Sequence, residues 1–358
     1  MREKALIAMS GGVDSSVAAY LMKKAGYDVV GATMILHDEV PVEDVLEDRK
    51  CSSSDVDDAK AVADRLDIPF YVFDFTKEFK EEVIDRFVKA YEEGRTPNPC
   101  VDCNKYIKFQ KFFEKGIDME QDVIVTGHYA RIEIGNDGKY RLKKGLDTGK
   151  DQSYVLYSMT QEELAHTRFP LGELTKEEVR VIAEKLNFVN ADKKESQDIC
   201  FVSDGDYVDF IEEYTGKKYM PGEFMDREGN VLGTHRGMIG YTIGQRKGLG
   251  LALKQPMYVV EKDMANNRVI LGYNSDLMTT EFEAGDCNWI SGVAPSGAIK
   301  AWARTRYNQK EAPATVEVIG KSRIRVVFDT PQRAITKGQS VVLYDGDFVL
   351  GGGIIDVT

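Results

Sequence analysis

A glycine-rich turn near the start of the chain constrains the fold more than any other feature of the sequence. The turn reads SGGVDSS (10–16) and joins a short apolar run, 5–9, to a segment with helical apolar spacing, 13–25. Gly26, a residue type common directly after a helix, ends that segment, and 28–36 reads as a second buried strand. The sequence therefore predicts a β–α–β unit with the glycines at the start of its helix.

The same alternation continues over the first two hundred residues. Helix-like segments at 55–66 and 77–91 alternate with strand-like segments at 70–75 and 122–126. Thr175 and Glu178 predict a capping box at the start of a further helix. This order predicts an α/β class, Rossmann-like fold with a parallel sheet covered by helices. The connections that lack periodicity, and that we expect to carry function, are 37–54, 94–104, 135–152 and 187–204.

The pattern changes after residue 205. Glycine-rich, strand-like pieces predict a small central domain of mixed structure, 206–280. Short alternating runs follow at 314–319, 323–328 and 340–344, with a turn at Asp345-Gly346. These runs predict a C-terminal antiparallel β-barrel, 281–358, and leave 1–205 as the α/β domain.

Composition narrows the functional classes. The 59 carboxylates outnumber the 47 lysines and arginines, and the net charge of −12 argues against coating of nucleic acid or membranes by bulk attraction. The five cysteines (51, 100, 103, 200 and 287) are too few and too scattered for a disulfide scaffold, which favours a reducing compartment. The first residues lack the apolar stretch of a secretory signal, and no apolar run approaches the ~20 residues of a membrane span. We expect a cytoplasmic protein without a membrane partner.

The SGGVDSS turn has the chemistry of an anion site. A helix N-terminus offers unpaired N–H groups and a positive dipole end, and glycines let the backbone approach a phosphate. Serine hydroxyls add donors, and Asp14 can hold a Mg²⁺ ion that bridges phosphates. An ordinary turn with a serine helix cap is the alternative. The chain has neither GxxxxGK[S/T] nor a strand-borne GxGxxG, so a different nucleotide chemistry is required.

The turn resembles the pyrophosphate-binding loop of the ATP pyrophosphatase (PP-loop) superfamily. Members of that superfamily activate a carbonyl oxygen with AMP and release pyrophosphate. The resemblance implies ATP as a substrate and assigns catalysis to the PP-loop domain, 1–205.

The cysteines indicate a second kind of chemistry besides nucleotide binding, namely that of reactive thiols. Cys100 and Cys103 lie on a proline-stiffened segment, and Cys200 lies in another irregular stretch. A thiolate with a lowered pKa is a strong nucleophile and a sulfur carrier. The C-x-x-C spacing also fits a metal, but only four histidines and no second such pair are present, which argues against structural zinc. An iron–sulfur cluster on Cys100, Cys103 and Cys200 stays open as an alternative.

The whole chain resembles the tRNA-specific 2-thiouridylases, which replace the 2-oxygen of the wobble uridine (position 34) with sulfur. The matching stretches occur in family order: SGGVDSS (10–16), GRTPNPCVDCN (94–104), TGHYAR (126–131), GLDTGKDQSY (145–154), SQDICF (196–201), YTIGQRKGLG (241–250) and YDGDFVLGGG (344–353). The resemblance implies a tRNA anticodon stem-loop as partner and a tRNA-binding role for 206–280. It also implies ATP, Mg²⁺ and a persulfide supplied by a cysteine desulfurase or a sulfur-relay protein.

The resemblance further implies roles for individual residues. Cys103 matches the family nucleophile and Cys200 the cysteine that bears the persulfide. The expected ATP contacts are Ala8, Met9, Ser10, Gly11, Gly12, Val13, Asp14, Ser15, Met34 and Gly127. The expected contacts to the target base are Asn98, Pro99 and Cys100, and those to the rest of the tRNA are His128, Lys150, Asp151, Gln152, Arg306, Tyr307 and Gln339. Many members have Asp where this chain has Cys100, so the acid or base here is another group or water.

Two basic stretches fit a tRNA partner. Residues 231–254 contain Arg236, Arg246, Lys247 and Lys254 and no carboxylate. Residues 301–325 contain six basic residues against Glu311 and Glu317, with Trp302 and Tyr307 available for stacking. Solvated charge on strand faces is the alternative. Two other functions stay open: a synthetase that amidates a small carboxylate or nucleotide, and an RNA-binding module that senses nucleotide without turnover.

Overall fold

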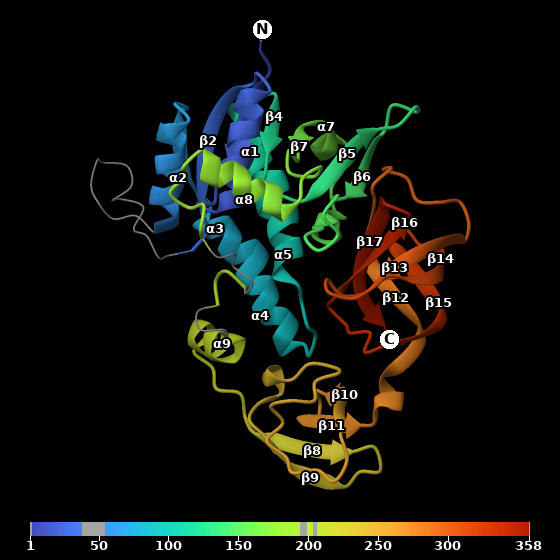
Figure 1. The fold of residues 1–358 in the computed structure, drawn as a ribbon. Coiled ribbons are helices and arrows are strands. Elements are labelled where there is room, and N and C mark those ends of the chain that lie inside the picture. The colour runs from blue at the N-terminus through green and yellow to red at the C-terminus, as the bar shows by residue number, and fades with distance from the viewer. Residues whose placement is uncertain (1, 38–53, 194–198, 203–205, 358) are drawn as a thin grey trace.

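The computed structural model describes residues 2–37, 54–193, 199–202 and 206–357 (Figure 1). Most of the connection predicted at 37–54, including Cys51, lies outside the described residues, as do Ser196, Gln197 and Asp198 of the SQDICF motif. Among the described residues, no helix is both long and apolar enough to cross a membrane.

A five-stranded parallel sheet forms the centre of the N-terminal domain. Its strand order is β3-β2-β1-β4-β7. The strands are β1 (Lys4–Ala8), β2 (Asp28–Ile35), β3 (Phe70–Asp74), β4 (Val123–Val125) and β7 (Thr167–Arg168). Alternate residues of a strand face opposite sides of the sheet. Ala5 and Ile7 accordingly pack on one side and Leu6 and Ala8 on the other. The Rossmann-like parallel sheet that the sequence predicts is confirmed.

Helices cover both faces of this sheet (Figure 1). The Ala5–Ile7 side carries α1 (Val13–Lys24), α2 (Ser54–Arg65) and α8 (Lys176–Lys185). The other side carries α3 (Thr76–Phe79), η2 (Lys80–Ile84), α4 (Asp85–Glu92), α5 (Pro99–Asp102), η3 (Cys103–Lys111) and α6 (Phe112–Asp118). Thr175 caps α8, and Glu178 completes the capping box that the sequence predicts.

The segment 94–104 is not irregular throughout, contrary to the sequence-based expectation. A helix begins at Pro99, and α5 runs on through the π-helical η3 into α6. The Asn98 side chain accepts a hydrogen bond from the Cys100 N–H at 3.1 Å, and proline fits the first helical position. Cys100 and Cys103 therefore sit on consecutive turns of a helix rather than on a loop.

The segment 135–152 also differs from the expectation of turns alone. Its residues Tyr140–Lys144 form β6, which pairs with β5 (Ala130–Ile134) in a hairpin. Two short helices, η4 (Ser153–Leu156) and α7 (Gln161–Ala165), and the loop that leads into α8 connect the later elements of this domain. The hairpin extends towards the C-terminal sheet and pairs with it at Lys143 and Phe348.

The central region begins with a helix, not with the strand that the glycine-rich pattern predicts. Asp206 caps α9 (Tyr207–Thr215) by accepting a hydrogen bond from the Val208 N–H at 2.9 Å, and Gly216 ends the helix in the left-handed conformation. A mixed sheet of order β10-β11-β8-β9 follows. The strands of this sheet are β8 (Gly222–Asp226), β9 (Val231–His235), β10 (Tyr258–Asp263) and β11 (Arg268–Gly272). Two short helices, η6 (Met238–Gly240) and η7 (Asn274–Leu277), complete the central region.

The C-terminal region is a closed antiparallel barrel, as the sequence predicts. Its strands are β12 (Met278–Trp289), β13 (Ile299–Arg304), β14 (Ala312–Gly320), β15 (Arg323–Arg333), β16 (Ser340–Asp345) and β17 (Phe348–Val357). The order β12-β15-β14-β13-β16-β17 closes through the pairing of β12 with β17. The domain boundaries at 205/206 and 280/281 stay predictions.

Glycines in β17 bring the barrel into close contact with the N-terminal domain. A Cβ at Gly352 would overlap the Val341 carbonyl oxygen and lie 2.7 Å from Cδ2 of Tyr157. Two hydrogen bonds cross the same contact: the Tyr154 hydroxyl donates to the Ser340 carbonyl at 2.7 Å, and the Ser340 hydroxyl donates to Tyr157 at 3.2 Å. The barrel is thus fixed beside the helix that carries the cysteines.

Replacement of Gly352 by Ala should destabilise the protein by about 1–3 kcal/mol, because the new methyl group overpacks this contact. Gly297→Ala is the matched control, since a Cβ there meets nothing within 4 Å. Urea denaturation monitored by tryptophan fluorescence measures both variants. Equal midpoints for the two variants would show that the contact tolerates a side chain.

Candidate functional site

The glycine-rich turn forms an open helix N-terminus. Gly12 is the N-cap of α1, and within the described residues no side chain caps the helix there. Gly11 adopts φ +71°, and a Cβ at this position would overlap the backbone of Asp55. The first N–H groups of an α-helix have no partner inside the helix. This geometry fits an anion and differs from the serine-capped turn that was the alternative.

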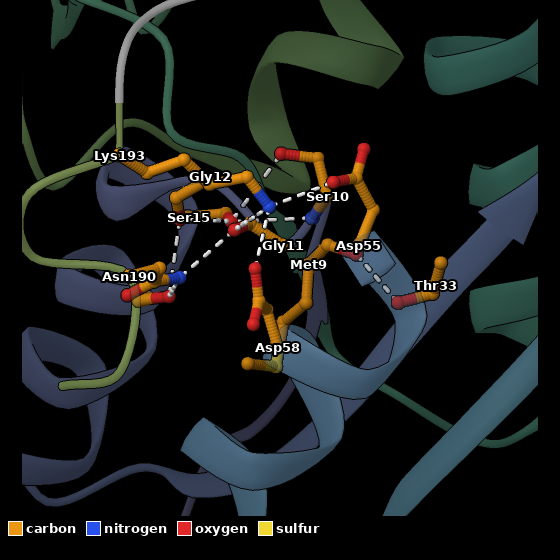
Figure 2. Close-up of polar contacts among 11 residues, drawn as sticks. Met9, Ser10, Gly11, Gly12, Ser15, Thr33, Asp55, Asp58, Asn190 and Lys193 are labelled. Atoms are coloured by element: carbon orange, nitrogen blue, oxygen red, sulfur yellow. Dashed lines mark hydrogen bonds and ion pairs between the residues drawn. The ribbon is translucent and has the colours of Figure 1, made fainter. Parts of the chain in front are cut away.

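The serine hydroxyls shape the turn from inside (Figure 2). The hydroxyls of Ser15 and Ser16 each donate to the Gly12 carbonyl at 3.0 Å, and Ser15 Oγ accepts from the Ser10 N–H at 3.1 Å. Thr33 donates its hydroxyl proton to the Met9 carbonyl at 2.7 Å. A hydroxyl has one proton to donate. In this arrangement the hydroxyl protons of Ser15 and Ser16 are used inside the turn, and the backbone N–H groups remain to face an anion.

Two residues that the sequence analysis did not identify, Asn190 and Lys193, bind the turn from outside. Asn190 Nδ2 donates to the Gly11 carbonyl and to Ser16 Oγ, both at 2.9 Å. Lys193 Nζ donates to the same carbonyl at 3.3 Å and pairs with Asp55 at 2.7 Å and Asp58 at 2.5 Å (Figure 2). These partners lie far apart in the sequence, so no local motif points to them.

The other expected nucleotide contacts gather at the same edge of the sheet. Ala8 ends β1, Met34 lies near the end of β2, and Val13 opens α1. Gly127, just after β4, passes directly over the turn, since a Cβ there would lie 2.9 Å from the Ser15 nitrogen. In open α/β sheets, ligands bind beyond the carboxyl ends of the strands. The structure brings the expected nucleotide residues together at such an edge.

Asp14 does not fit the predicted role of a Mg²⁺ ligand. Lys176 Nζ lies 2.8 Å from each of its carboxylate oxygens, and the Tyr129 hydroxyl donates to Oδ1 at 2.8 Å. A Mg²⁺ ion on Asp14 would stand beside an ammonium group and repel it.

Three free thiols lie near one another on the opposite face of the sheet. Cys100 and Cys200 are exposed and Cys103 is buried, and the charges of their thiolates disfavour one another. Burial raises the pKa of Cys103 to about 12. Desolvation also raises the pKa of Cys100 and of Cys200, because surrounding protein removes water from each sulfur although part of the side chain reaches solvent.

The three thiols do not form a metal-binding group within the described part of the chain. The iron–sulfur alternative therefore does not fit the side chains as the structure places them. Cys287 lies apart from them in the barrel, on β12, and burial raises its pKa to about 12.

Lys108 is a functional candidate that the sequence reasoning missed. Its charge lowers the pKa of Cys100, Cys103 and Cys200, in opposition to the larger effect of burial. It follows Cys103 by one turn of η3, and π-helical turns of this kind occur often at functional sites. Recognition of the helix that begins at Pro99 would have placed the two residues on neighbouring turns.

The expected tRNA contacts of the N-terminal domain are largely buried. The ring of His128 packs at a tilted angle against Phe109, and His128 shares a hydrogen bond of 2.7 Å with Thr126. Burial holds the pKa of His128 well below its ordinary value. Asp151 accepts hydrogen bonds from Gly145 and Ser153. Gln152 accepts one from the Tyr129 N–H, and Lys150 is half-buried.

The expected tRNA contacts of the barrel hold the parts of the protein together. Arg306 Nη2 donates to Ile243 O at 3.0 Å, Ala334 O at 2.9 Å and Thr336 Oγ1 at 2.6 Å. The Tyr307 hydroxyl donates to the Asp151 carbonyl at 3.3 Å. Gln339 Nε2 donates to the Thr96 carbonyl at 2.7 Å, next to the Asn98 cap and Pro99. Of these side chains, Gln339 thus helps to position the segment that precedes the first two thiols.

The two basic stretches differ in how many of their charges form ion pairs in the fold. Within 301–325, three arginines pair with carboxylates from distant segments: Arg304 with Asp151, Arg323 with Glu283 and Asp356, and Arg325 with Glu281. The positive excess counted along that stretch is therefore largely cancelled. Arg236, Arg246, Lys247 and Lys254 are exposed, and none of them has an ion pair within the described residues.

Comparison with known proteins identifies the family. A model of the tRNA methyl transferase HUP domain matches residues 3–204, a PRC-barrel model of the same name matches 208–273, and an aminomethyltransferase beta-barrel model matches 279–355. The tRNA-specific 2-thiouridylase MnmA of Clostridioides difficile is 49% identical over 357 residues, with 99% of both chains covered. That of Acetivibrio thermocellus is 50% identical over 356 residues, again with 99% of both chains covered. This chain belongs to the tRNA-specific 2-thiouridylase family.

Membership of the 2-thiouridylase family confirms the resemblance that the seven motifs indicate. It covers the α/β domain, the central sheet and the barrel, because the relatives align with the chain almost from end to end. Two of the matching models carry the words methyl transferase, whereas the full-length relatives are 2-thiouridylases. A group of three thiols suits the sulfur chemistry of the latter name.

Thiol reactivity should follow the pKa directions. A raised pKa keeps a thiol protonated until the pH approaches that value, so Cys103, at about 12, should stay unmodified by iodoacetamide between pH 6 and 9. Cys200 should react, faster at higher pH. Lys108→Met removes the charge that lowers the pKa of Cys200 and should slow its alkylation by roughly two- to tenfold at pH 8.

Peptide mass spectrometry after timed alkylation measures these rates. Lys105→Met is the matched control on the same helix, because Lys105 pairs with Asp286 at 3.0 Å. If both lysine variants slow the alkylation of Cys200 equally, the effect of Lys108 on this thiol does not depend on its position.

Proposed function

We propose that this chain synthesises 2-thiouridine at the wobble position of tRNA, with ATP as the activating substrate. The observation that carries the proposal is the pairing of an open helix N-terminus with a group of three free thiols in one domain. Ala8 and Met34, at the nucleotide edge, pack in the same hydrophobic cluster as Cys103 and Phe201. Full-length relatives named tRNA-specific 2-thiouridylase support the same reaction.

The first step is adenylation of the uridine. ATP binds with its phosphates at the N-terminus of α1, where the N–H groups and the helix dipole stabilise negative charge. The 2-carbonyl oxygen of the flipped-out uridine attacks the α-phosphorus, and pyrophosphate leaves. The oxygen then departs as part of AMP, a far better leaving group than oxide. A flipped base exposes the edge that the enzyme must reach.

The second step delivers sulfur. A cysteine desulfurase or a sulfur-relay protein transfers the outer sulfur of its persulfide to Cys200, and the donor regains a thiol. In one route, the outer sulfur of the Cys200 persulfide attacks C2 and displaces AMP, and Cys103 then attacks the inner sulfur, which breaks the S–S bond and releases 2-thiouridine. In the other route, Cys103 attacks the inner sulfur first and releases hydrosulfide, which attacks C2 and displaces AMP. Either route leaves a Cys103–Cys200 disulfide, which an external dithiol reduces.

The neutral thiols of the resting protein suit this sequence. Burial keeps Cys103 protonated at neutral pH, so it does not attack before a persulfide stands opposite it. The charge of Lys108 favours the thiolate once the reaction begins. We assign Cys100 to the pocket wall for the base, beside Asn98 and Pro99.

The tRNA approaches the central region in this proposal. Arg236, Arg246, Lys247 and Lys254 present exposed positive charge there. Phosphate contacts of this kind fix the position of a nucleic acid, while the pocket selects the base. Arg304 and Arg306 are already bonded within the protein and are weaker candidates for phosphate contact.

Replacement of Cys200 by Ser should separate the two steps. Thiolated product should fall below about 1% of the wild-type level, because Ser carries no persulfide. Pyrophosphate release with tRNA and ATP should stay within about threefold of wild type, because adenylation needs no thiol. Mass spectrometry of nucleosides and a pyrophosphate assay measure the two steps.

Cys287→Ser, in the barrel, is the control for this experiment and should thiolate normally. Release of ADP and phosphate as stoichiometric products would contradict the adenylation step. Pyrophosphate release that needs ammonia or glutamine instead of tRNA would indicate an amide synthetase.

Replacement of both Arg246 and Lys247 by Ala should flatten the dependence of tRNA affinity on log salt by about 1.5, because each lost phosphate contact removes roughly 0.7–0.9 from the slope. The matched control is Arg323→Ala with Arg325→Ala, two barrel arginines already paired with carboxylates. Filter binding between 50 and 300 mM salt measures both. If the salt dependence of tRNA affinity flattens more in the Arg323→Ala, Arg325→Ala variant than in the Arg246→Ala, Lys247→Ala variant, the tRNA binds on the barrel.

A further inference from the structure

An ion pair between a buried lysine and a partly exposed aspartate lies at the phosphate turn and has no role in the reaction proposed above. Lys176 opens α8 and is 8% exposed, and its ammonium lies 2.8 Å from both carboxylate oxygens of Asp14. The Tyr129 hydroxyl donates to one of these oxygens at 2.8 Å, and the ammonium lies 5.9 Å from the centre of the Tyr129 ring. Two segments far from the turn in sequence thus converge on the second residue of α1.

The structure fixes this lysine from several sides. Thr175 and Glu178 close a capping box around the start of α8, and the Lys176 N–H donates to Asp147 at 3.0 Å. Helices α1 and α8 pack against each other, so the side chain has a short path to the turn. Taking an ammonium and a carboxylate out of water costs free energy that close geometry only partly offsets. A pair held this firmly beside an open helix N-terminus calls for a functional explanation.

We propose that Lys176 binds the β- and γ-phosphates of ATP, and that Asp14 positions this lysine instead of holding a metal ion. The inference rests on the proposed ATP-dependent function and names the charged group of its nucleotide site. Asp14 belongs to the first turn of α1, whose N–H groups face the same anion. An ammonium one hydrogen bond away from that residue therefore adjoins the phosphates bound there.

The chemistry of the first step needs such a cation. When the uridine oxygen bonds to the α-phosphorus, the bond from that phosphorus to the bridging oxygen breaks, and pyrophosphate leaves with the electron pair. A fixed ammonium stabilises this developing charge without rearrangement. The turn lacks the lysine of a GxxxxGK[S/T] loop, and Lys176 supplies the equivalent charge from a helix 160 residues further along the chain.

Isothermal titration of the tRNA-free protein with ATP, inorganic pyrophosphate and AMP tests the inference. Lys176→Met should weaken binding of ATP and pyrophosphate by about 10- to 100-fold, both with Mg²⁺ and with EDTA. Binding of AMP, which lacks the two outer phosphates, should change by less than about threefold. Lys176→Arg should restore most of the affinity, and Lys185→Met, an exposed lysine in the last turn of α8, should bind as wild type.

Further variants keep the test decisive if Lys176→Met folds poorly. Asp14→Asn with Lys176→Met leaves no unpaired charge, should fold, and should show the same selective loss. Equal losses for AMP and ATP would reveal a structural role only and overturn the inference. So would pyrophosphate binding by Lys176→Met at wild-type affinity, or wild-type binding that requires Mg²⁺ and is lost in Asp14→Asn alone. If the wild type binds no ATP, the proposed function falls with it.

Discussion

The position of the Asp14 carboxylate is the constraint on which the nucleotide edge of the molecule depends. Tyr129 from the segment after β4 and Lys176 from α8 both bind it, and Gly127 packs against its backbone. Two segments that lie far from the turn in sequence are thereby held at the start of α1. Because the serine hydroxyls bond within the turn and Gly12 offers no side-chain cap, the helix N–H groups stay open. The turn is thus shaped before any anion arrives.

On the opposite face of the sheet, burial controls the reactivity of the Cys103 thiol. The helix from Pro99 carries Cys103 into an apolar cluster, where loss of water outweighs the nearby charge of Lys108. A thiol with a pKa of about 12 resists oxidation and stray alkylation at neutral pH. Its reactivity must then come from a partner placed directly against it, which suits a reaction between Cys103 and a persulfide. The loss of water that protects the Cys103 thiol in the resting protein therefore also delays its attack until a persulfide is in place.

Local sequence signals predicted the elements that depend on local forces. The β–α–β unit, the capping box at Thr175 and the barrel strands follow from periodicity and caps. The helix at Pro99 was missed because two prolines and a glycine in the segment 94–99 suggest a loop, while its start depends on one Asn98 hydrogen bond. The charge excess of 301–325 shows a second limit of reading the sequence locally. Its arginines find carboxylates such as Glu281 and Asp356, and linear spacing cannot reveal that pairing.

The barrel connects to the thiols through hydrogen bonds that a tRNA could also use. Gln339 donates to the carbonyl of Thr96, and Tyr307 donates to that of Asp151. Both bonds end on backbone next to residues assigned to the tRNA site, Asn98 and Gln152. A hydrogen-bond donor that serves the protein in the free state must change partner before it serves a phosphate or a base. Direct contact of tRNA with these side chains would therefore loosen the barrel from the segment before Cys100, and so couple tRNA binding to the position of the first thiols.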